Sequence, residues 1–473
     1  MTWTRRLSLG LALCVFTSTS QAQSPYAPAS SGQQPIRLPA SALIQQTAAE
    51  PAKAPMPLAD PGAKPVVVTP APVATPAPVE TPAPAAVPAP EPAPAEDDAP
   101  LGPTPFTSVK ILQNAIFGEG GDAPINFGGW LDADYTYRST GSGRNNIAPV
   151  ENRFGNELLA REIGLMISKP LDQKCLSWGF NVIFIAGADA SFLQPTAGYP
   201  AQTNPRFGQS FTDLNVTAHL PILTDGGVDV KIGRQTTCLG PMGALAWQRP
   251  FTSSDYAWYE LEEGRYTGVS TVWHVSKRLD LYNGIEVGGW GVFFDNPSRG
   301  IGYLGQVNYW LDEEAKKTKV WLTVLTGPTG FYNDGNTTAV EVGGQHNYNK
   351  CFYQIVDFQM NYSKAPIFFQ PPPGYQERAY DVYTYFGYHL TKELDVNSRF
   401  EWYKDVDGGG YPGGFGTPKT DFFETTVGLD YHPVKWLQFR PEVRYDHATH
   451  DAFGENYNKK DQLSIAADVL IKF

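Results

Sequence analysis

Four acidic side chains lie close together in one long segment, residues 239 to 264, which also carries Trp247, Trp258 and Tyr259 as possible anchors. They are Asp255, Glu260, Glu262 and Glu263. Four arginines lie elsewhere, in stretches where apolar and polar residues alternate: Arg234, Arg399, Arg440 and Arg444. Acidic and basic groups on opposite sides of a narrow, water-filled opening create a field that admits polar molecules and rejects apolar ones. The chemistry suggested by these residues is electrostatic selection at a pore.

The same charges also allow a purely structural reading. Charged residues at every second position in one stretch could pair with one another and with acids in neighbouring stretches: Arg440, Glu442, Arg444 and Asp446, with Glu401, Glu424 and Asp430. No spacing rule separates pairing along a wall from selection across an opening. Both interpretations stay open, and they are compatible.

The stretches that carry these charges have the pattern of β-strands with one face in lipid. Near the end of the chain, Leu437, Phe439, Val443 and Tyr445 alternate with the charged set just described. Successive side chains of a strand point to opposite faces. Because an arginine facing lipid at mid-membrane costs about 2–4 kcal/mol, Arg440 and Arg444 must point inward. Arg399 follows the same alternation, whereas Arg234 is out of phase with Val228, Val230 and Ile232.

The chain ends with apolar residues at every second position, Leu463, Ile465, Ala467, Val469, Ile471 and Phe473. This ending resembles the C-terminal signal of bacterial outer-membrane β-barrels, with Phe473 as the residue that the barrel assembly machinery reads. No stretch after the N-terminal leader is long and apolar enough for a membrane helix, so a membrane would have to be crossed by strands.

The alternation predicts a transmembrane antiparallel up-and-down β-barrel of about sixteen strands, although fourteen or eighteen fit almost as well. The predicted starts lie near residues 125, 157, 178, 209, 228, 265, 279, 300, 317, 338, 352, 379, 393, 421, 435 and 462. Short and long connections alternate, as in bacterial barrels. The acidic segment 239–264 then becomes the third outer loop. A soluble all-β sandwich or propeller is the alternative, but it would not need a secretory signal or the terminal Phe473.

The N-terminal part of the chain differs sharply in composition. Residues 1–22 have Arg5 and Arg6, a short apolar run and a small-residue cleavage site, which is the pattern of a signal peptide. Residues 23–105 are rich in proline and alanine; 22 of the 41 prolines precede residue 106. Such a segment buries too little apolar surface to fold. We therefore expect a disordered periplasmic spacer, which could touch the cell wall, before a barrel at residues 106–473.

The remaining features give no enzyme, metal or cofactor prediction. The barrel region has a net charge of about −10, which argues against nucleic-acid binding. His447, His450 and Asp451 have a spacing that could hold a metal, but no third ligand is evident. Asn333–Asn336 has the ordinary composition of a turn. Cys175, Cys238 and Cys351 form no disulfide framework. Residues 108–117 predict a short helix at the rim or in the lumen.

Four short stretches resemble one family of bacterial proteins: Ile125–Ala133 (INFGGWLDA), Ser168–Asp172 (SKPLD), Gly187–Ala190 (GADA) and Lys231–Gln235 (KIGRQ). Together they resemble the putative β-barrel porin-2 family, also called OmpL-like, over about residues 110 to 473. The resemblance implies an outer-membrane porin of unassigned substrate, with no catalytic residues to transfer.

These observations predict an outer-membrane porin, embedded in lipid, whose water-filled channel passes small hydrophilic solutes or ions. In the sixteen-stranded general porins that the arrangement resembles, the third loop folds into the lumen opposite an arginine ladder, and by the same analogy a homotrimer is expected. The alternative is a structural or adhesive barrel with a blocked lumen, tethered to the cell wall through its proline-rich segment.

Overall fold

The computed structural model describes most of the region predicted to be a barrel. It covers residues 111–117, 125–140, 154–195, 198–200, 204, 206–260, 262, 264–288, 292–293, 300–313, 316–328, 336–363, 376–408, 419–454 and 457–473. Only the backbone is described for residues 115–117, 259 and 260. The signal peptide 1–22 and the spacer 23–105 lie outside these ranges and stay predictions.

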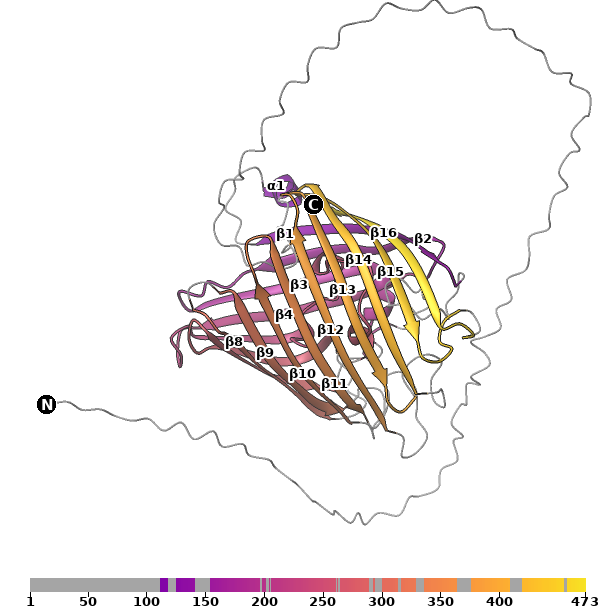
Figure 1. The fold of residues 1–473 in the computed structure, drawn as a ribbon. Helices are drawn as coiled ribbons and strands as arrows, with labels where there is room; N and C mark the ends of the chain where they lie inside the picture. The colour runs from indigo at the N-terminus through magenta and orange to yellow at the C-terminus, as the bar shows by residue number, and fades with distance from the viewer. Residues whose placement is uncertain are drawn as a thin grey trace, which may run out of the picture. The chain divides into compact units, whose positions relative to one another are not determined.

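Sixteen strands form one closed barrel in which every neighbouring pair is antiparallel and β1 pairs with β16 (Figure 1). The predicted fold class and strand number are confirmed, and each strand begins within two residues of its predicted start. The strands are β1 (Asn126–Arg138), β2 (Leu158–Lys169), β3 (Ser177–Gly187), β4 (Gly208–Leu220), β5 (Val228–Thr236), β6 (Arg265–His274), β7 (Leu279–Val287), β8 (Ile301–Trp310), β9 (Thr318–Pro328), β10 (Asn336–Asn347), β11 (Phe352–Ser363), β12 (Glu377–His389), β13 (Leu394–Asp405), β14 (Thr420–Val434), β15 (Leu437–Ala448) and β16 (Asp461–Lys472).

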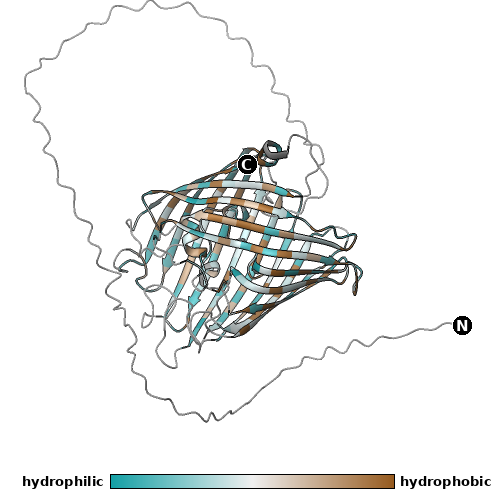
Figure 2. Ribbon diagram, turned by 180° about the vertical axis from the view of Figure 1, so that it is seen from behind, coloured by the Kyte–Doolittle hydropathy of each residue, from teal (hydrophilic) through white to brown (hydrophobic). Residues whose placement is uncertain are grey.

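The barrel has an apolar outer face and a polar inner face, which Figure 2 shows as alternating brown and teal along the strands. In β16, Ile465 and Val469 are exposed on the outer face, whereas Ser464 and Asp468 between them are buried inside. This arrangement suits a wall with lipid on one side and polar groups on the other.

The last residue closes the barrel. The amide nitrogen of Phe473 donates to the carbonyl oxygen of Gly129 (2.9 Å), and Gly129 donates back to Phe473 (2.8 Å). A Cβ atom on Gly129 would lie 2.7 Å from the Phe473 ring, so glycine is required where the two ends of the sheet meet.

Short turns join the strands at one end of the barrel, which we call the turn end, and longer connections join them at the opposite end. Cys175 and Cys351 lie in two of the turns as free, exposed thiols. The helix α1 (Ile111–Phe117) contacts β1 and lies near the C-terminus (Figure 1). No described helix is long and apolar enough to cross a membrane.

Candidate functional site

The third long connection, residues 237–264, crosses the lumen; we call it loop 3. It leaves β5 and returns to β6, yet its backbone bonds to β13 and β15. Because β13 is eight strands from β5 in either direction around the sixteen-stranded barrel, the loop must run across the interior. It contains a 3-10 turn, η3 (Ala246–Gln248), and a short helix, α3 (Tyr256–Glu260). The inward course expected for the third loop is what the structure has.

Three of the four predicted wall arginines hold loop 3 by its carbonyl oxygens. Arg399 Nη1 donates to the carbonyl of Ser253 (3.2 Å), and Arg444 Nη1 donates to that of Ser254 (2.5 Å). Arg440 Nη1 donates to two loop carbonyls, at 2.6 Å each. Charge-assisted hydrogen bonds of this kind are stronger than neutral ones. The arginines therefore fasten the backbone of the loop to the wall.

The same arginines also pair with acids along the wall. Arg399 Nε lies 2.9 Å from Glu424 Oε2, and Arg444 Nε lies 2.8 Å from Asp446 Oδ1. Arg440 Nε donates to Asp468 Oδ1 (3.0 Å). All three arginines are at most 1 % exposed. Wall pairing and loop contact thus occur together, and the guanidinium groups lie under the loop instead of facing an open aperture.

Two wall acids complete the attachment by accepting from loop amides. Glu401 Oε1 accepts from the backbone nitrogens of Tyr256 (2.6 Å) and Ala257 (3.1 Å), at the start of α3. Glu442 Oε2 accepts from those of Thr252 (2.8 Å) and Ser253 (3.1 Å). Since arginines bind loop carbonyls while glutamates bind loop amides, one stretch of backbone is held at both kinds of polar group.

The predicted loop acids contact uncharged partners. Asp255 Oδ1 accepts from the Trp258 backbone nitrogen (2.7 Å), and its Oδ2 bonds to the Tyr385 hydroxyl. Glu262 Oε1 accepts from Gln359 Nε2 on β11 (2.7 Å). Burial, with the nearby carboxylates of Asp255 and Glu341, raises the pKa of Glu262 well above its usual range. The side chain of Glu260 and all of Glu263 lie outside the described residues.

Arg234 lies apart from this cluster. It pairs in the sheet with Leu214 and Thr267, in the phase of the exposed outer residue Ile232. Its guanidinium donates to the carbonyls of Phe211 (3.0 Å) and Val292 (3.1 Å). The preceding Gly233 has φ +128°, a conformation that only glycine adopts readily. The structure therefore does not bring Arg234 to the wall opposite loop 3.

A second buried ion pair holds loop 3 from β2, and the sequence reasoning missed it. Arg161 Nη2 lies 2.9 Å from Asp189 Oδ2, in the helix α2 (Ala188–Leu193), and its Nη1 donates to the carbonyl of Thr252 (3.0 Å). Next to it, Glu162 accepts from the indole nitrogen of Trp130 (2.6 Å) and from the Ala246 amide (2.9 Å). The sequence signal was the charged pair Arg161–Glu162 inside an otherwise apolar strand.

The described cavities lie on the other side of loop 3. One, of about 350 Å³, is lined by loop residues 239–244, by Trp247, Trp258 and Glu262, and by Arg265 of β6. Another, of about 410 Å³, lies against the inner faces of β2 to β7 and includes Lys169, Asp229 and Lys231. Space remains in the lumen on the side away from the arginines.

The weaker metal candidates of the sequence are not assembled. His447 Nδ1 lies 2.8 Å from Asp461 Oδ1 on β16, and the structure shows no metal-sized group containing His450 or Asp451 among the described residues. Residues 333–335 of the asparagine-rich turn lie outside the described part.

The comparisons with known proteins agree with this architecture. A family model described as putative beta-barrel porin-2, OmpL-like, matches residues 124–473. The chain belongs to this family. The resemblance inferred from the short motifs is thereby confirmed, and the chain is an outer-membrane β-barrel of a porin family. None of the curated proteins searched matches this porin-2 family member.

Solved structures share the barrel with this porin-2 family member at low sequence identity. OmpF of Salmonella typhi, in complex with daunomycin, is 11 % identical, with 74 % of this chain and 97 % of that one covered and a TM-score of 0.49. The channel DcaP of Acinetobacter baumannii is 12 % identical (74 % and 97 %, TM-score 0.47). An anion-selective porin of Comamonas acidovorans is 12 % identical (74 % and 99 %, TM-score 0.45).

Proposed function

We propose that this porin-2 family member forms a water-filled channel for passive diffusion of small hydrophilic solutes or ions, with loop 3 as its constriction. The supporting observation is the one-sided attachment of loop 3. Its backbone is fixed to β13 and β15, while the cavities lie against loop 3 and β2 to β7. A barrel of this strand number is too wide for its own side chains to fill. A loop fixed to one wall narrows such a lumen and leaves a path beside the other.

In this proposal the charges at the constriction differ from the predicted ladder. Glu262 and Arg265 both line the cavity beside loop 3, whereas the wall arginines are covered. Asp255, Glu260, Glu262 and Glu263 supply the acidic side of the constriction, and Arg399, Arg440 and Arg444 position it. The proposal contains no chemical reaction, and the proposed setting is the bacterial outer membrane, with the spacer in the periplasm and a homotrimer as the assembly.

Single-channel recording tests the open channel directly. The purified protein is inserted into a planar lipid bilayer, and stable steps of nanosiemens order are expected. A folded barrel that gives no conductance steps would overturn the proposal.

Charge reversal tests the constriction separately. Changing Glu260, Glu262 and Glu263 to Lys together is expected to shift the reversal potential in a salt gradient toward anion preference, because the acids would no longer attract cations. The matched control changes Asp172, Asp225 and Glu393, which are exposed in turns, to Lys. An equal shift in both variants would show that loop 3 does not set ion preference.

A structural or adhesive barrel with a blocked lumen is the second candidate. It is favoured by the complete burial of the wall arginines under loop 3, which shows that this part of the lumen is filled. The absence of conductance, together with binding of the spacer 23–105 to cell-wall material, would support it.

A further inference from the structure

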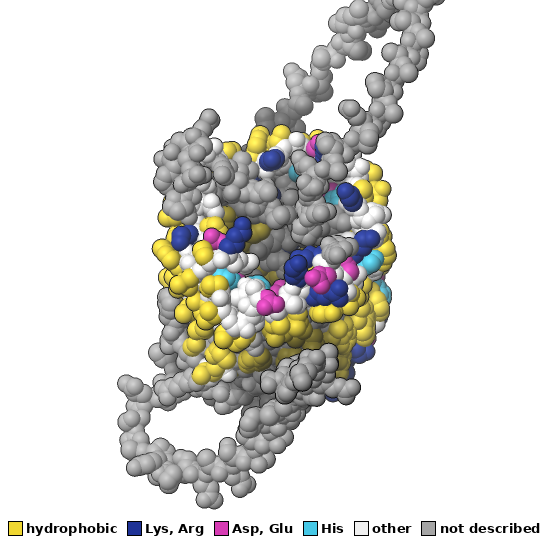
Figure 3. All heavy atoms as spheres, turned by 90° about the vertical axis from the view of Figure 1, so that its left-hand side faces the viewer, with side chains coloured by type: hydrophobic (Ala, Val, Ile, Leu, Met, Phe, Trp, Pro, Cys, Tyr) yellow, Lys and Arg dark blue, Asp and Glu magenta, His cyan; other side chains and the backbone are white. Residues whose placement is uncertain are grey.

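Four of the seven histidines face the lumen at the turn end of the barrel, each beside an aspartate of the same face. The outward neighbours Tyr388 and Tyr431 are exposed, which shows that His389 and His432 point inward. Figure 3 shows histidines and charged side chains gathered at this end, with apolar side chains on the flanks. The nearest distances between imidazole nitrogen and carboxylate oxygen are His219–Asp229 2.6 Å, His274–Asp280 2.8 Å, His389–Asp395 2.7 Å and His432–Asp430 3.6 Å.

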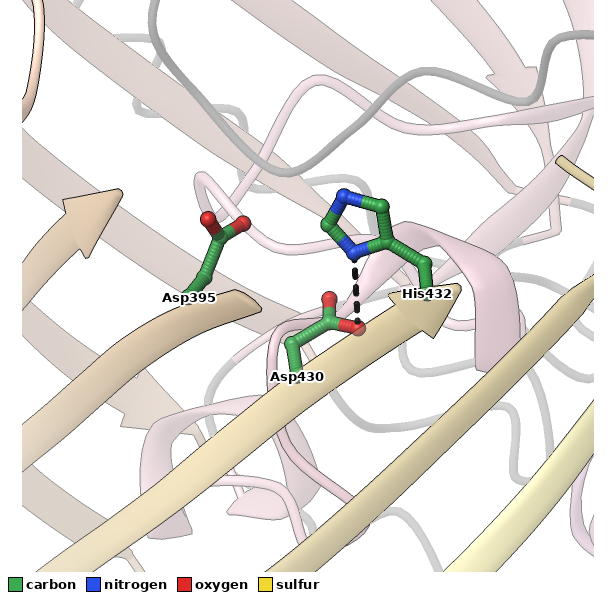
Figure 4. A group of neighbouring side chains, drawn as sticks. All are labelled: Asp395, Asp430 and His432. Carbon is green, nitrogen blue, oxygen red and sulfur yellow. Dashed lines mark ion pairs between the residues drawn. The ribbon is translucent and has the colours of Figure 1, made fainter. Parts of the chain in front are cut away.

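Two of these aspartates stand directly opposite each other. Asp395 of β13 pairs in register with Asp430 of β14, and both are buried inside the barrel wall. Like charges directly opposite on one face of a sheet repel and destabilise the pair. Figure 4 shows the two carboxylates and the His432 ring facing a common space, with ligand atoms of all three within 4.8 Å of one another. A cation in this space would relieve the repulsion.

The hydrogen bonds orient the three side chains and leave specific atoms free. His432 Nε2 lies 3.0 Å from the Lys392 carbonyl oxygen, which can only accept. Nε2 therefore carries a proton, and in the neutral ring Nδ1 presents its lone pair to Asp430 Oδ1 at 3.6 Å. Asp430 is 5 % exposed, and its Oδ1 has no hydrogen-bond partner among the described residues. Two electron-pair donors thus face each other without a hydrogen bond between them.

Neighbouring groups support the same geometry from behind. His389 Nδ1 holds one oxygen of Asp395 (2.7 Å), and Gln438 Nε2 donates to Asp430 Oδ2 (2.8 Å). Metal ligands are commonly oriented by such outer hydrogen bonds, including a backbone carbonyl bound to the second ring nitrogen of a histidine. The His432 side chain is 27 % exposed, so water can reach the site.

We propose that Asp395, Asp430 and His432 bind a divalent transition-metal ion of the Zn²⁺ type at the turn end of the lumen. Imidazole nitrogen and carboxylate oxygen suit Zn²⁺ at about 2.0–2.2 Å, and three protein ligands leave a fourth position for water. Small rotations of the carboxylates bring the ligand atoms from their present separation to that geometry. The site uses β13 and β14 alone and does not depend on the channel function.

Equilibrium dialysis of the purified full-length protein against Zn²⁺ tests the proposal. About one ion per chain is expected to bind saturably, and H432Q and D430N are each expected to weaken binding at least tenfold. The matched control is H274Q, which removes another inward histidine that is paired with an aspartate but belongs to no three-ligand group in the described residues. Absence of saturable binding, or an equal loss in H274Q and H432Q, would overturn the proposal.

A second variant guards against misfolding and against the competing explanation that His432 merely carries an extra proton. With Co²⁺ as the probe, His432→Cys is expected to add a thiolate-to-cobalt charge-transfer band that the wild type lacks, because sulfur replaces nitrogen as a ligand. Heat-modifiable mobility in gels identifies the folded barrel. A folded His432→Cys protein with the spectrum of free Co²⁺ would refute metal binding at this position.

Discussion

Arg399 illustrates how one buried side chain joins the wall to loop 3. Its guanidinium pairs with Glu424 and also donates to the carbonyls of Ser253 and Ser254. A buried ion pair is weak evidence for net stability, but removing one partner leaves a buried charge without compensation.

Replacement of Arg399 by Met is therefore expected to lower the free energy of unfolding by about 3–5 kcal/mol. Urea unfolding followed by tryptophan fluorescence measures it. The double variant R399M/E424Q removes the orphaned charge and is expected to recover part of the loss. No recovery in the double variant would show that the cost comes from lost packing and loop contacts alone.

Glu262 gives a pH dependence whose sign follows from its raised pKa. Its folded-state pKa lies well above the unfolded value because burial, Asp255 and Glu341 disfavour the charged form. Its contribution to stability is therefore fully present below the unfolded pKa, about 4.3, and is lost as pH rises through the raised folded value.

The isosteric variant E262Q stays neutral at every pH, and its amide oxygen can still accept from Gln359. Relative to wild type, E262Q is expected to become more stable as pH rises from 5 to 9, measured as the difference in free energy of unfolding. A difference that stays constant across this range would contradict a raised pKa.

At the scale of elements, loop 3 packs on β1 and β2 through a ring that the alternation had left unexplained. Trp130 departs from the apolar pattern of its strand because it points inward, where its nitrogen bonds Glu162 and its ring meets Trp247 edge-on (6.2 Å between centroids). The ring lies over Gly164, where a Cβ would be 2.2 Å from a ring atom.

G164A is accordingly expected to displace Trp130 and to destabilise the barrel by about 1–3 kcal/mol, as overpacking does. The control is G344A, also within a strand, whose added Cβ would meet its nearest neighbour at 3.4 Å, an ordinary contact. Thermal unfolding of both variants measures the effect. Equal melting temperatures would show that the Trp130 position is not constrained.

The strands could be predicted from sequence because the cost of exposing charge to lipid enforces a period of two. The direction of Arg399 followed from that period, but its loop partners did not, since Ser253 lies 146 residues away and reaches it only through the course of loop 3. Local backbone irregularities also defeated the period. Arg161 and Glu162 both point inward beside a register shift between β1 and β2, and Arg234 follows a glycine of positive φ.

At the scale of the whole molecule, the turns report which side of the membrane they occupy. Cys175 and Cys351 are exposed in turns that the even strand number assigns to the periplasm, while burial raises the pKa of the Cys238 thiol well above its usual range.

A bulky, membrane-impermeant maleimide is therefore expected to add two labels per chain in cells with a permeabilised outer membrane and none in intact cells. Mass spectrometry counts the labels, and the double variant C175S/C351S is the control. Labelling of intact cells would reverse the predicted orientation.

The pairing of Gly129 with Phe473 also bears on how the molecule can be made. Until the final residue exists, β1 has no partner on one side, and the growing sheet presents two bare edges that can pair with other chains. The contacts that remove those edges join opposite ends of the barrel sequence, and such long-range pairings form slowly. The chain must therefore be kept from pairing prematurely until it is complete, and shortening it by a few C-terminal residues would leave a seam beside β1 open.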